Sequence, residues 1–265
     1  MTELRFFNTI GMERAHQVLT GFHGGSCVVA TRVCPNESVN QDGAAVIELG
    51  YQTAVLIVAD GAGGYSDGAY ASRLVVDTLE TKLRRWSNYA DLRLPIIEAI
   101  EHCNNVLRQR KTASASTVVV AELQGRTVRH YLVGDSSIYV MGQRGAIRLQ
   151  SVPQSVVGYG IESGFLPEDA ALEHEDRHIV LNLVGIEDAK IELGSQVKLK
   201  QRDTILLCSD GLTDNLSAEH IIDAIRCGDL SEGVRSLMDR GNIAMQQNGG
   251  HPDDMALIAW RPLSG

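Results

Sequence analysis

The sequence predicts an α+β fold, a four-layer αββα sandwich in which two antiparallel β-sheets are flanked by helices. Short strand-like runs follow one another as hairpins, with turns at residues 124–125 and 142–145 that contain glycine. The two clearest helical patterns are consecutive, over residues 68–86 and from Pro95 onward, and do not alternate singly with strands. Hairpin strands and grouped helices favour antiparallel layers over a doubly wound parallel sheet.

Composition sets the class of protein. The chain has 265 residues, 44% of them hydrophobic, and a formal net charge of −9 at pH 7. This length can bury one substantial core, and no linker-like stretch interrupts it, so we expect a single domain over residues 1–265. The acidic charge argues against nucleic acid as a partner, because Lys and Arg make most contacts to phosphate backbones.

No apolar stretch approaches the roughly 20 residues of a spanning helix, and the five cysteines form no CxxC pair. We therefore expect a cytoplasmic protein with free thiols and no membrane partner.

The first elements are two strands followed by two helices. Residues 44–49 and 54–59 predict paired strands joined by a turn at Gly50. The second strand, AVLIVA, is apolar on both faces and is therefore expected to be buried. Helical spacing follows over residues 68–86, and Pro95 opens the second helix.

An antiparallel meander comes next. Its strands are expected at residues 117–123, 127–133, 138–141 and 146–149. The pattern then weakens over residues 151–175, where Gly and Pro interrupt it, which predicts a mobile flap over a site. Further strands are predicted at residues 178–184, 189–193, 197–199, 204–208 and 255–260. Ser217 is expected to cap a helix, and one more helix precedes the last strand.

Four aspartates stand at the ends of apolar strand-like runs or in glycine-rich turns: Asp42, Asp60, Asp210 and Asp253. Mg²⁺ and Mn²⁺ prefer oxygen ligands, and a carboxylate left unpaired at such a place is unfavourable. For any single Asp-Gly pair, a plain turn is an equally good interpretation, because Asp hydrogen-bonds its own backbone. Taken together, the four aspartates indicate a metal-dependent enzyme.

Six motifs in chain order resemble the signatures of the PP2C (PPM) family of metal-dependent protein serine/threonine phosphatases, in particular its bacterial members. The motifs are NQD at 40–42, VADGAGG at 58–64, ASTVVVA at 115–121, VGDSSIYV at 133–140, CSDGLTDNL at 208–216 and PDDMAL at 252–257. Each is a weak signal alone, but six in the right order are jointly specific. The resemblance extends over residues 40–260.

The resemblance implies hydrolysis of phosphoserine and phosphothreonine in proteins, by a water between two Mn²⁺ or Mg²⁺ ions that attacks phosphorus in line. Asp60 corresponds to the bridging ligand, and with Asp210 it is the residue on which catalysis is expected to depend. A third, more weakly held ion is implied at Asp135. The positions that correspond to metal ligands are Asp42, Asp60, Gly61, Asp135, Asp210 and Asp253. A phosphorylated protein substrate and a cognate Ser/Thr kinase are the implied partners.

The chain departs from the family where an arginine normally binds the substrate phosphate, five residues before the first aspartate. This chain has Glu37 there, and a carboxylate repels phosphate. Arg32, expected in an irregular segment nearby, is the candidate replacement. Ala62 stands where eukaryotic members have a general-acid histidine. His251 is interpreted as a solvated residue and not as a proton donor.

Three further aspartates, Asp67, Asp203 and Asp214, are interpreted as turn or cap residues, and Asp254 as a supporting residue behind the metal ligands. Two other functions stay open. One is a poorly active phosphoprotein-binding regulatory module, suggested by Glu37. The other is a hydrolase of a small phosphoester, which would use the same ions and differ in the flap.

Overall fold

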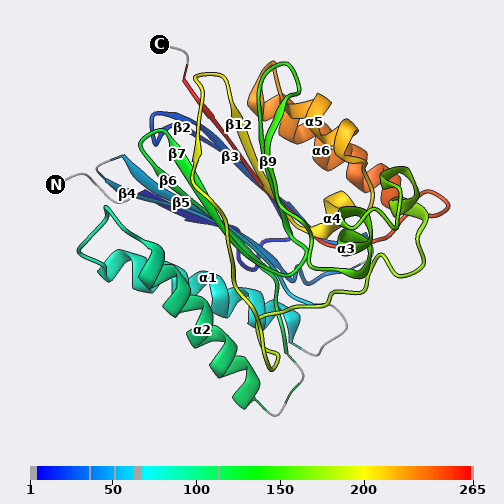
Figure 1. The fold of residues 1–265 in the computed structure, drawn as a ribbon, viewed down its shortest axis with the longest axis horizontal. Helices are drawn as coiled ribbons and strands as arrows, with labels where there is room; N and C mark the ends of the chain where they lie inside the picture. The colour runs from blue at the N-terminus through cyan, green and yellow to red at the C-terminus, as the bar shows by residue number, and fades with distance from the viewer. Residues whose placement is uncertain are drawn as a thin grey trace.

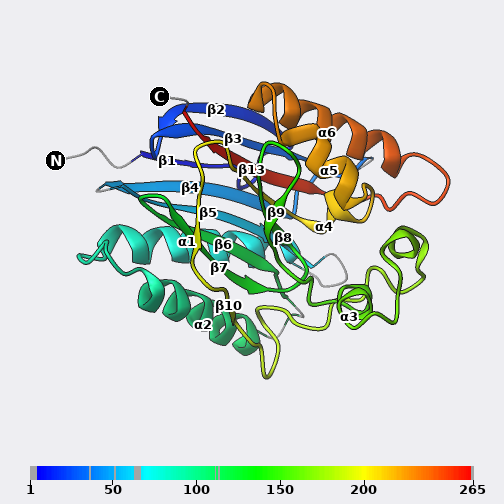
Figure 2. The same cartoon turned by 45° about the horizontal axis from the view of Figure 1, so that its top comes forward.

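Four layers make up the molecule in the computed structural model, which describes residues 5–35, 37–50, 52–62, 67–110, 112 and 114–263. Two antiparallel sheets lie face to face. Helices α1 (Gly68–Arg85) and α2 (Arg93–Gln109) cover the outer face of one sheet, and α5 (Ala218–Ile225) and α6 (Leu230–Met245) cover the other (Figures 1 and 2). The predicted αββα sandwich is confirmed.

The sheet under α1 and α2 has the strand order β1-β4-β5-β6-β7-β10, and β11 also pairs with β7. Its strands are β1 (Arg5–Asn8), β4 (Asp42–Gly50), β5 (Thr53–Asp60), β6 (Val118–Gln124), β7 (Thr127–Val133), β10 (Glu192–Leu193) and β11 (Val197–Lys198). In β5, Val55 and Ile57 pack toward the helices, whereas Leu56 and Val58 pack toward the second sheet. Because successive side chains alternate between faces, this strand is buried on both sides, as its AVLIVA run predicts.

The second sheet has the order β2-β3-β13-β12-β8-β9. Its strands are β2 (Arg14–Phe22), β3 (Gly25–Arg32), β8 (Ser137–Met141), β9 (Ile147–Gln150), β12 (Thr204–Cys208) and β13 (Met255–Pro262). Alternating residues of β3, β12 and β13 join the core between the sheets or the core beneath α5 and α6. Ser217 caps α5 as predicted, since its hydroxyl accepts a hydrogen bond from the amide of His220.

Three parts of the predicted element order need correction. No strand is predicted before residue 44, whereas β1, β2 and β3 lie there and β3 pairs with β13 along its whole length. The stretch 178–184 is not a strand, because it makes only isolated bridges from Val180 to Ser155 and from Val184 to Ser116. The expected strand at 189–193 shortens to its last two residues.

The predicted flap, residues 151–175, contains α3 (Val156–Glu162) and a 3₁₀ helix, η1 (Glu168–Glu173). Ser155 starts α3, and its hydroxyl accepts a hydrogen bond from the amide of Gly158. The segment lies beside the short helix α4 (Asp210–Thr213), as Figure 2 shows for α3. Across the described residues, no helix has the length and apolar character needed to cross a bilayer.

Candidate metal centre

Three carboxylates converge where strands of both sheets end. Asp60 is the last residue of β5, Asp135 lies in the turn between β7 and β8, and Asp210 opens α4 directly after β12. One oxygen from each of these side chains lies within 4.8 Å of the other two. The β4–β5 register also places Asp42 directly opposite Asp60. Asp60 and Asp210, which are 150 positions apart in the sequence, thus belong to one cluster of carboxylates.

The backbone of Asp60 is fixed by the segment that leads into β6. The amide of Asp60 donates to the Thr117 hydroxyl at 3.1 Å, and its carbonyl accepts from the Ser116 hydroxyl at 2.8 Å and from the Thr117 amide at 2.8 Å. The Thr117 hydroxyl in turn lies 2.7 Å from that of Ser136, beside Asp135. These contacts give the ASTVVVA motif a role that its sequence does not reveal, which is to orient the bridging candidate.

Asp42 is buried and has a partner of its own. The Ser209 hydroxyl donates to its carboxylate at 2.6 Å, and the Asn40 side chain accepts from its amide at 3.0 Å. Ser209 directly precedes Asp210, so the same residue links two members of the predicted ligand set. Asp42 thus lies beside Asp60 with its own hydrogen-bond partners, and its role as an outer-shell carboxylate stays a prediction.

Asp253 and Asp254 are neighbours in sequence but make different contacts. The Asp254 carboxylate accepts from the amides of Cys34 and Gln41, both at 2.6 Å, and so joins the loop before β13 to the loop before β4. The Asp253 carboxylate accepts from the amide of Asp254 at 2.7 Å, and its charge adds to burial and to other neighbouring aspartates in raising the pKa of Asp60 and of Asp42. The structure therefore places Asp253 beside the cluster and Asp254 behind it as a support.

Gly61 follows Asp60 at a point where no side chain fits. A Cβ there would lie 2.2 Å from the carbonyl oxygen of Gly68, the first residue of α1, and 2.9 Å from that of Gln41. The Gly61 amide donates to the Gln41 carbonyl at 3.1 Å. A glycine is required because two backbone segments approach it closely.

Among the described residues, none forms an ion pair with Asp60, Asp135 or Asp210. Burial, with the negative charges of neighbouring aspartates, raises the pKa of Asp135 to about 6 and those of Asp210 and Asp253 to about 7. The same causes raise the pKa of Asp42 and Asp60 well above their usual range. Asp135 Oδ1 and Asp210 Oδ1 have no hydrogen-bond partner among the described residues. Converging oxygens with unused acceptor capacity fit a hard divalent cation such as Mn²⁺ or Mg²⁺.

Metal-free protein is therefore expected to lose stability as pH rises. A carboxyl whose pKa is higher in the folded than in the unfolded chain favours folding below its unfolded pKa, near 4. That contribution is lost as pH rises through the folded value, here about 6 to 7 for Asp135, Asp210 and Asp253. In EDTA we expect Tm at pH 8 to lie at least about 5 °C below Tm at pH 5.5. Thermal unfolding at both pH values checks this. An Asp210→Asn control should narrow the difference, and an unchanged or higher Tm at pH 8 would contradict the expectation.

Asp214, interpreted from sequence as a turn residue, belongs to the site. Burial, with the charges of Asp210 and Asp135, raises the pKa of Asp214 to about 9, and its Oδ2 has no hydrogen-bond partner in the described structure. It follows Asp210 by four residues, and its amide donates to the Asp210 carbonyl at 2.7 Å. The i,i+4 spacing in DGLTD was the signal that could have identified it, since such residues share one helix face.

His251 is half-buried, which corrects its interpretation as a solvated residue. Its Nδ1 lies 3.8 Å from the Asp214 carboxylate, and its ring stacks on that of His178 with the centroids 6.3 Å apart. Asn215 holds its backbone from both sides, donating to the His251 carbonyl at 2.8 Å and accepting from its amide at 2.9 Å. Burial, with the positive charge of Arg177, lowers the pKa of His251.

Arg32 does not lie in an irregular segment. It ends β3, and its guanidinium donates to the Met238 carbonyl at 3.1 Å and to the Asp239 carboxylate at 2.8 Å, both on α6. These contacts direct Arg32 to the outer face of the second sheet, away from the cluster. Glu37 is exposed, and its charge adds to burial in raising the pKa of Asp254, so the residue in the family's arginine position lies near Asp254.

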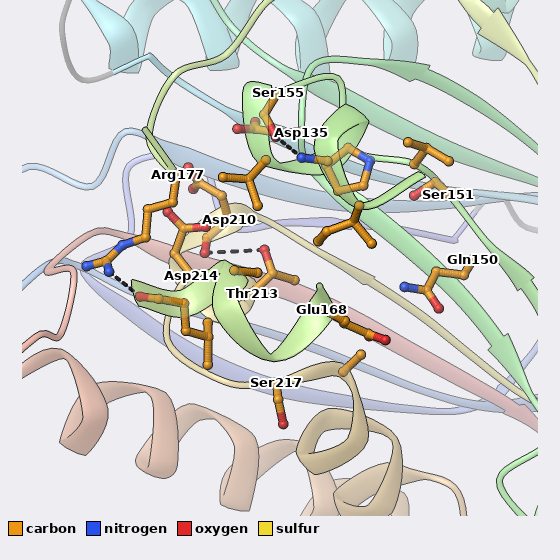
Figure 3. Close-up of a pocket in the computed structure, with 18 of the residues that line it drawn as sticks. Asp135, Gln150, Ser151, Ser155, Glu168, Arg177, Asp210, Thr213, Asp214 and Ser217 are labelled. Atoms are coloured by element: carbon orange, nitrogen blue, oxygen red, sulfur yellow. Dashed lines mark hydrogen bonds between the residues drawn. The ribbon is translucent and has the colours of Figure 1, made fainter. Parts of the chain in front are cut away.

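A cavity of about 390 Å³ adjoins the carboxylates, between the flap and the turn from α4 to α5. Figure 3 shows Arg177, Asp210 and Asp214 grouped at one end of it, with Gln150, Glu168 and Ser217 toward the other. Arg177 follows the flap, and its guanidinium donates to the carbonyls of Leu172 in η1 and of Gly249, the latter at 3.0 Å. It thereby joins the flap to the loop that leads to Asp253.

Comparisons with known proteins agree with this geometry. The chain is 26% identical over 244 residues to the serine/threonine phosphatase stp of Listeria welshimeri, covering 84% of this chain and 91% of that protein. The solved serine/threonine phosphatase of S. agalactiae matches with a TM-score of 0.77 at 24% identity, over 89% of this chain and 99% of that one. The catalytic domain of the serine threonine protein phosphatase PstP in complex with two manganese ions matches with a TM-score of 0.70 at 20% identity, over 98% of this chain and 99% of that one. Residues 31–240 match the family described as Protein phosphatase 2C. Since that match covers most of the sequence, the chain belongs to the protein phosphatase 2C family.

Proposed function

We propose that this protein hydrolyses phosphoserine and phosphothreonine in proteins with the help of divalent cations held by the aspartate cluster. The observation that carries the proposal is the convergence of Asp60, Asp135 and Asp210, with oxygens within 4.8 Å of one another and acceptor capacity left unused. Family membership and the phosphatase names of the relatives support the reaction class.

The residues divide into ligands and supports. We propose that Asp60 and the Gly61 carbonyl hold two Mn²⁺ or Mg²⁺ ions together with Asp210 and Asp253, while Asp42 acts from the outer shell. Asp135, near Asp210, would hold a third, weaker ion. When bound, such ions supply the Lewis acidity that acidifies the attacking water and offsets the charge of the phosphate.

The supports set the geometry of this centre. Thr117 and Ser116 orient Asp60 through its backbone, and Ser209 orients Asp42. Outer partners of this kind typically contribute about 10- to 100-fold to metal affinity or activity. The flap and the α4–α5 turn would then shape the path by which the phosphorylated residue reaches the centre.

A kinase that phosphorylates serine or threonine must supply such a substrate, and we propose one as the functional partner, with both proteins acting in the cytoplasm. The competing interpretation as a poorly active regulatory module rests on Glu37 alone. Nothing in the arrangement of Asp60, Asp135 and Asp210 favours it, because these three carboxylates converge and Asp42 lies opposite Asp60.

Glu37→Arg tests whether a missing cation limits phosphate binding. Glu37 is exposed, and its charge adds to burial in raising the pKa of Asp254. Reversing that charge is expected to lower KM for phosphopeptides by about fivefold with little change in kcat, since a charge-assisted contact contributes roughly 1 kcal/mol or more. Steady-state kinetics would measure both constants. The matched control is Glu101→Arg, which makes the same charge reversal at an exposed position of α2. An equal KM in the Glu37 and Glu101 variants would show that position 37 does not limit binding.

Phosphate release from a phosphothreonine peptide tests the proposed function itself. The protein is stripped with EDTA and assayed before and after Mn²⁺ is added back. We expect release only with metal. A folded, Mn²⁺-loaded protein that hydrolyses neither this peptide nor its phosphoserine equivalent would overturn the proposal, and hydrolysis of small phosphoesters alone would select the small-molecule alternative.

A further inference from the structure

The cavity beside the metal centre is larger than the phosphate chemistry requires. Its volume of about 390 Å³ falls within the range of about 300 to 1,000 Å³ that is typical of ligand sites. It lies between α3 and η1 of the flap on one side and the start of α5 on the other (Figure 3). A site that recognised only a phosphate and two ions would leave this space unused.

Much of its wall is apolar. Tyr139 of β8, Val157 and Ile161 of α3, Leu172 of η1 and Leu216 before α5 all contribute side chains to it. Tyr139 and Val157 are almost fully buried, at 4% and 8% exposure. An apolar group placed among these side chains would leave water for an apolar environment, which is favourable in proportion to the area removed from water.

The same cavity reaches the metal centre. Asp135 and Asp210 of the cluster belong to its wall, so a phosphorylated residue bound at the cluster lies at the mouth of the cavity. The next few residues of an extended peptide are each about 3.3 Å further along. A side chain close in sequence to the phosphoserine or phosphothreonine can therefore enter the cavity while the phosphate stays at the cluster.

The charges on the wall limit what that side chain can be. Glu162 and Glu168 add exposed acidic groups to the wall, whereas Arg177 is the one cation among the described lining residues. The two Nη atoms of Arg177 donate to backbone carbonyls, and its Nε has no hydrogen-bond partner among the described residues. An acidic side chain would meet like charges in a space of low polarity, which is strongly unfavourable. Apolar walls with an acidic surround fit a neutral, apolar side chain.

We propose that this cavity, defined by Tyr139, Val157, Ile161, Leu172 and Leu216, receives a large apolar side chain of the substrate, within about three residues of the phosphorylated one. The inference rests on the proposed function and makes it more specific. The preferred substrates are phosphoserine or phosphothreonine sites next to Leu, Met or Phe, and sites surrounded by Asp and Glu are poor ones.

A peptide scan tests the preference. The probes are phosphothreonine peptides of serine and glycine in which one leucine is moved from three residues before to three residues after the phosphothreonine. We expect at least one position to raise kcat/KM about tenfold over the all-serine peptide, since filling an apolar pocket discriminates by roughly 10- to 200-fold. Glutamate at that position should lower kcat/KM below the serine value. A scan in which no position differs from serine by more than about twofold would overturn the inference.

Substitutions that fill the cavity provide a second test of the leucine preference. Val157→Phe adds bulk from α3, and Ala218→Phe adds it from α5 on the opposite wall. Each is expected to remove the leucine preference, so that the ratio of kcat/KM between the leucine and serine peptides falls to about one. Two variants from opposite walls are used because either one alone could disturb local packing. Tyr159→Ala is the control, since Tyr159 lies on α3 with 46% exposure and does not line the cavity. A preference that survives in both filled variants, with circular dichroism like that of the native chain, would exclude this cavity as its source.

Failure of the inference can be told apart from failure of the proposed function. Para-nitrophenyl phosphate has no neighbouring residue and reports only the hydrolytic reaction. If Mn²⁺-dependent hydrolysis occurs without any leucine preference, the inference alone is wrong. If no phosphoester is hydrolysed, the proposed function is wrong. The cavity is then tested by binding alone, with the Kd of fluorescently labelled leucine and serine peptides measured by anisotropy. A lower Kd for the leucine peptide supports it, and equal Kd values contradict it.

Discussion

Replacing Asp60 by asparagine is expected to lower Mn²⁺-dependent phosphate release by more than 100-fold. Outer-shell partners typically contribute about 10- to 100-fold, and Asp60 is one of the three carboxylates that converge within 4.8 Å. Asparagine has nearly the same shape and can keep the backbone contacts to Thr117 and Ser116. The change therefore removes a charge and leaves the frame intact. Measuring kcat on a phosphothreonine peptide with saturating Mn²⁺ gives the size of the loss.

The control for Asp60→Asn is Asp77→Asn, which makes the same chemical change on the exposed face of α1. It should keep the native rate. Isothermal titration of each protein with Mn²⁺ links the loss of activity to metal, because the Asp60 variant should bind Mn²⁺ more weakly while the Asp77 variant binds as the native chain does. An Asp60 variant that keeps both activity and Mn²⁺ affinity would remove this residue from the centre.

Gly61→Ala is expected to destabilise the fold and abolish activity together. The added Cβ would lie 2.2 Å from the Gly68 carbonyl oxygen and 2.9 Å from that of Gln41. Both are backbone atoms, so no side chain can rotate away, and α1 must shift relative to β4 and β5. Overpacking of this kind costs about 3 kcal/mol, which corresponds to a fall in Tm of roughly 6 to 12 °C for a chain of this size.

Gly142→Ala is the matched control for that experiment. The nearest atoms to its added Cβ are 3.7 Å away, which is ordinary van der Waals contact, and its φ is not positive. Its Tm should stay within about 2 °C of the native value. Calorimetry of the two variants in Mn²⁺ measures the difference. Equal Tm values for them would show that the close approach at Gly61 is readily relieved.

Local patterns were sufficient to predict the central elements. Strand β5 is apolar at every position from Ala54 to Ala59, and α1 and α2 show clear helical periodicity, so each was predicted to within a few residues. The six motifs predicted which aspartates meet, because their order implied a fold before any contact was known. The structure brings Asp60, Asp135 and Asp210 together and puts Asp42 opposite Asp60.

What sequence did not reveal depends on contacts between distant segments. Strand β2 is mostly exposed and lies at a sheet edge, so its residues lack the alternation of a half-buried strand. The position of Arg32 follows from the packing of β3 against α6, which no local pattern encodes, whereas the i,i+4 spacing in DGLTD could have indicated Asp214. Arg32 is paired with Asp239, and Asp214 faces the cluster. The hydroxyls of Thr117 and Ser209 likewise became meaningful only once their partners were located.

Anomalous diffraction from crystals grown with Mn²⁺, with data collected on both sides of the manganese absorption edge, tests most directly the claim that the aspartate cluster is the metal centre. We expect two strong peaks that share Asp60 as a ligand, with Asp210 and Asp253 around one of them, and a weaker third peak near Asp135. Manganese bound elsewhere, with none at Asp60 in protein that hydrolyses phosphothreonine peptides, would contradict the account.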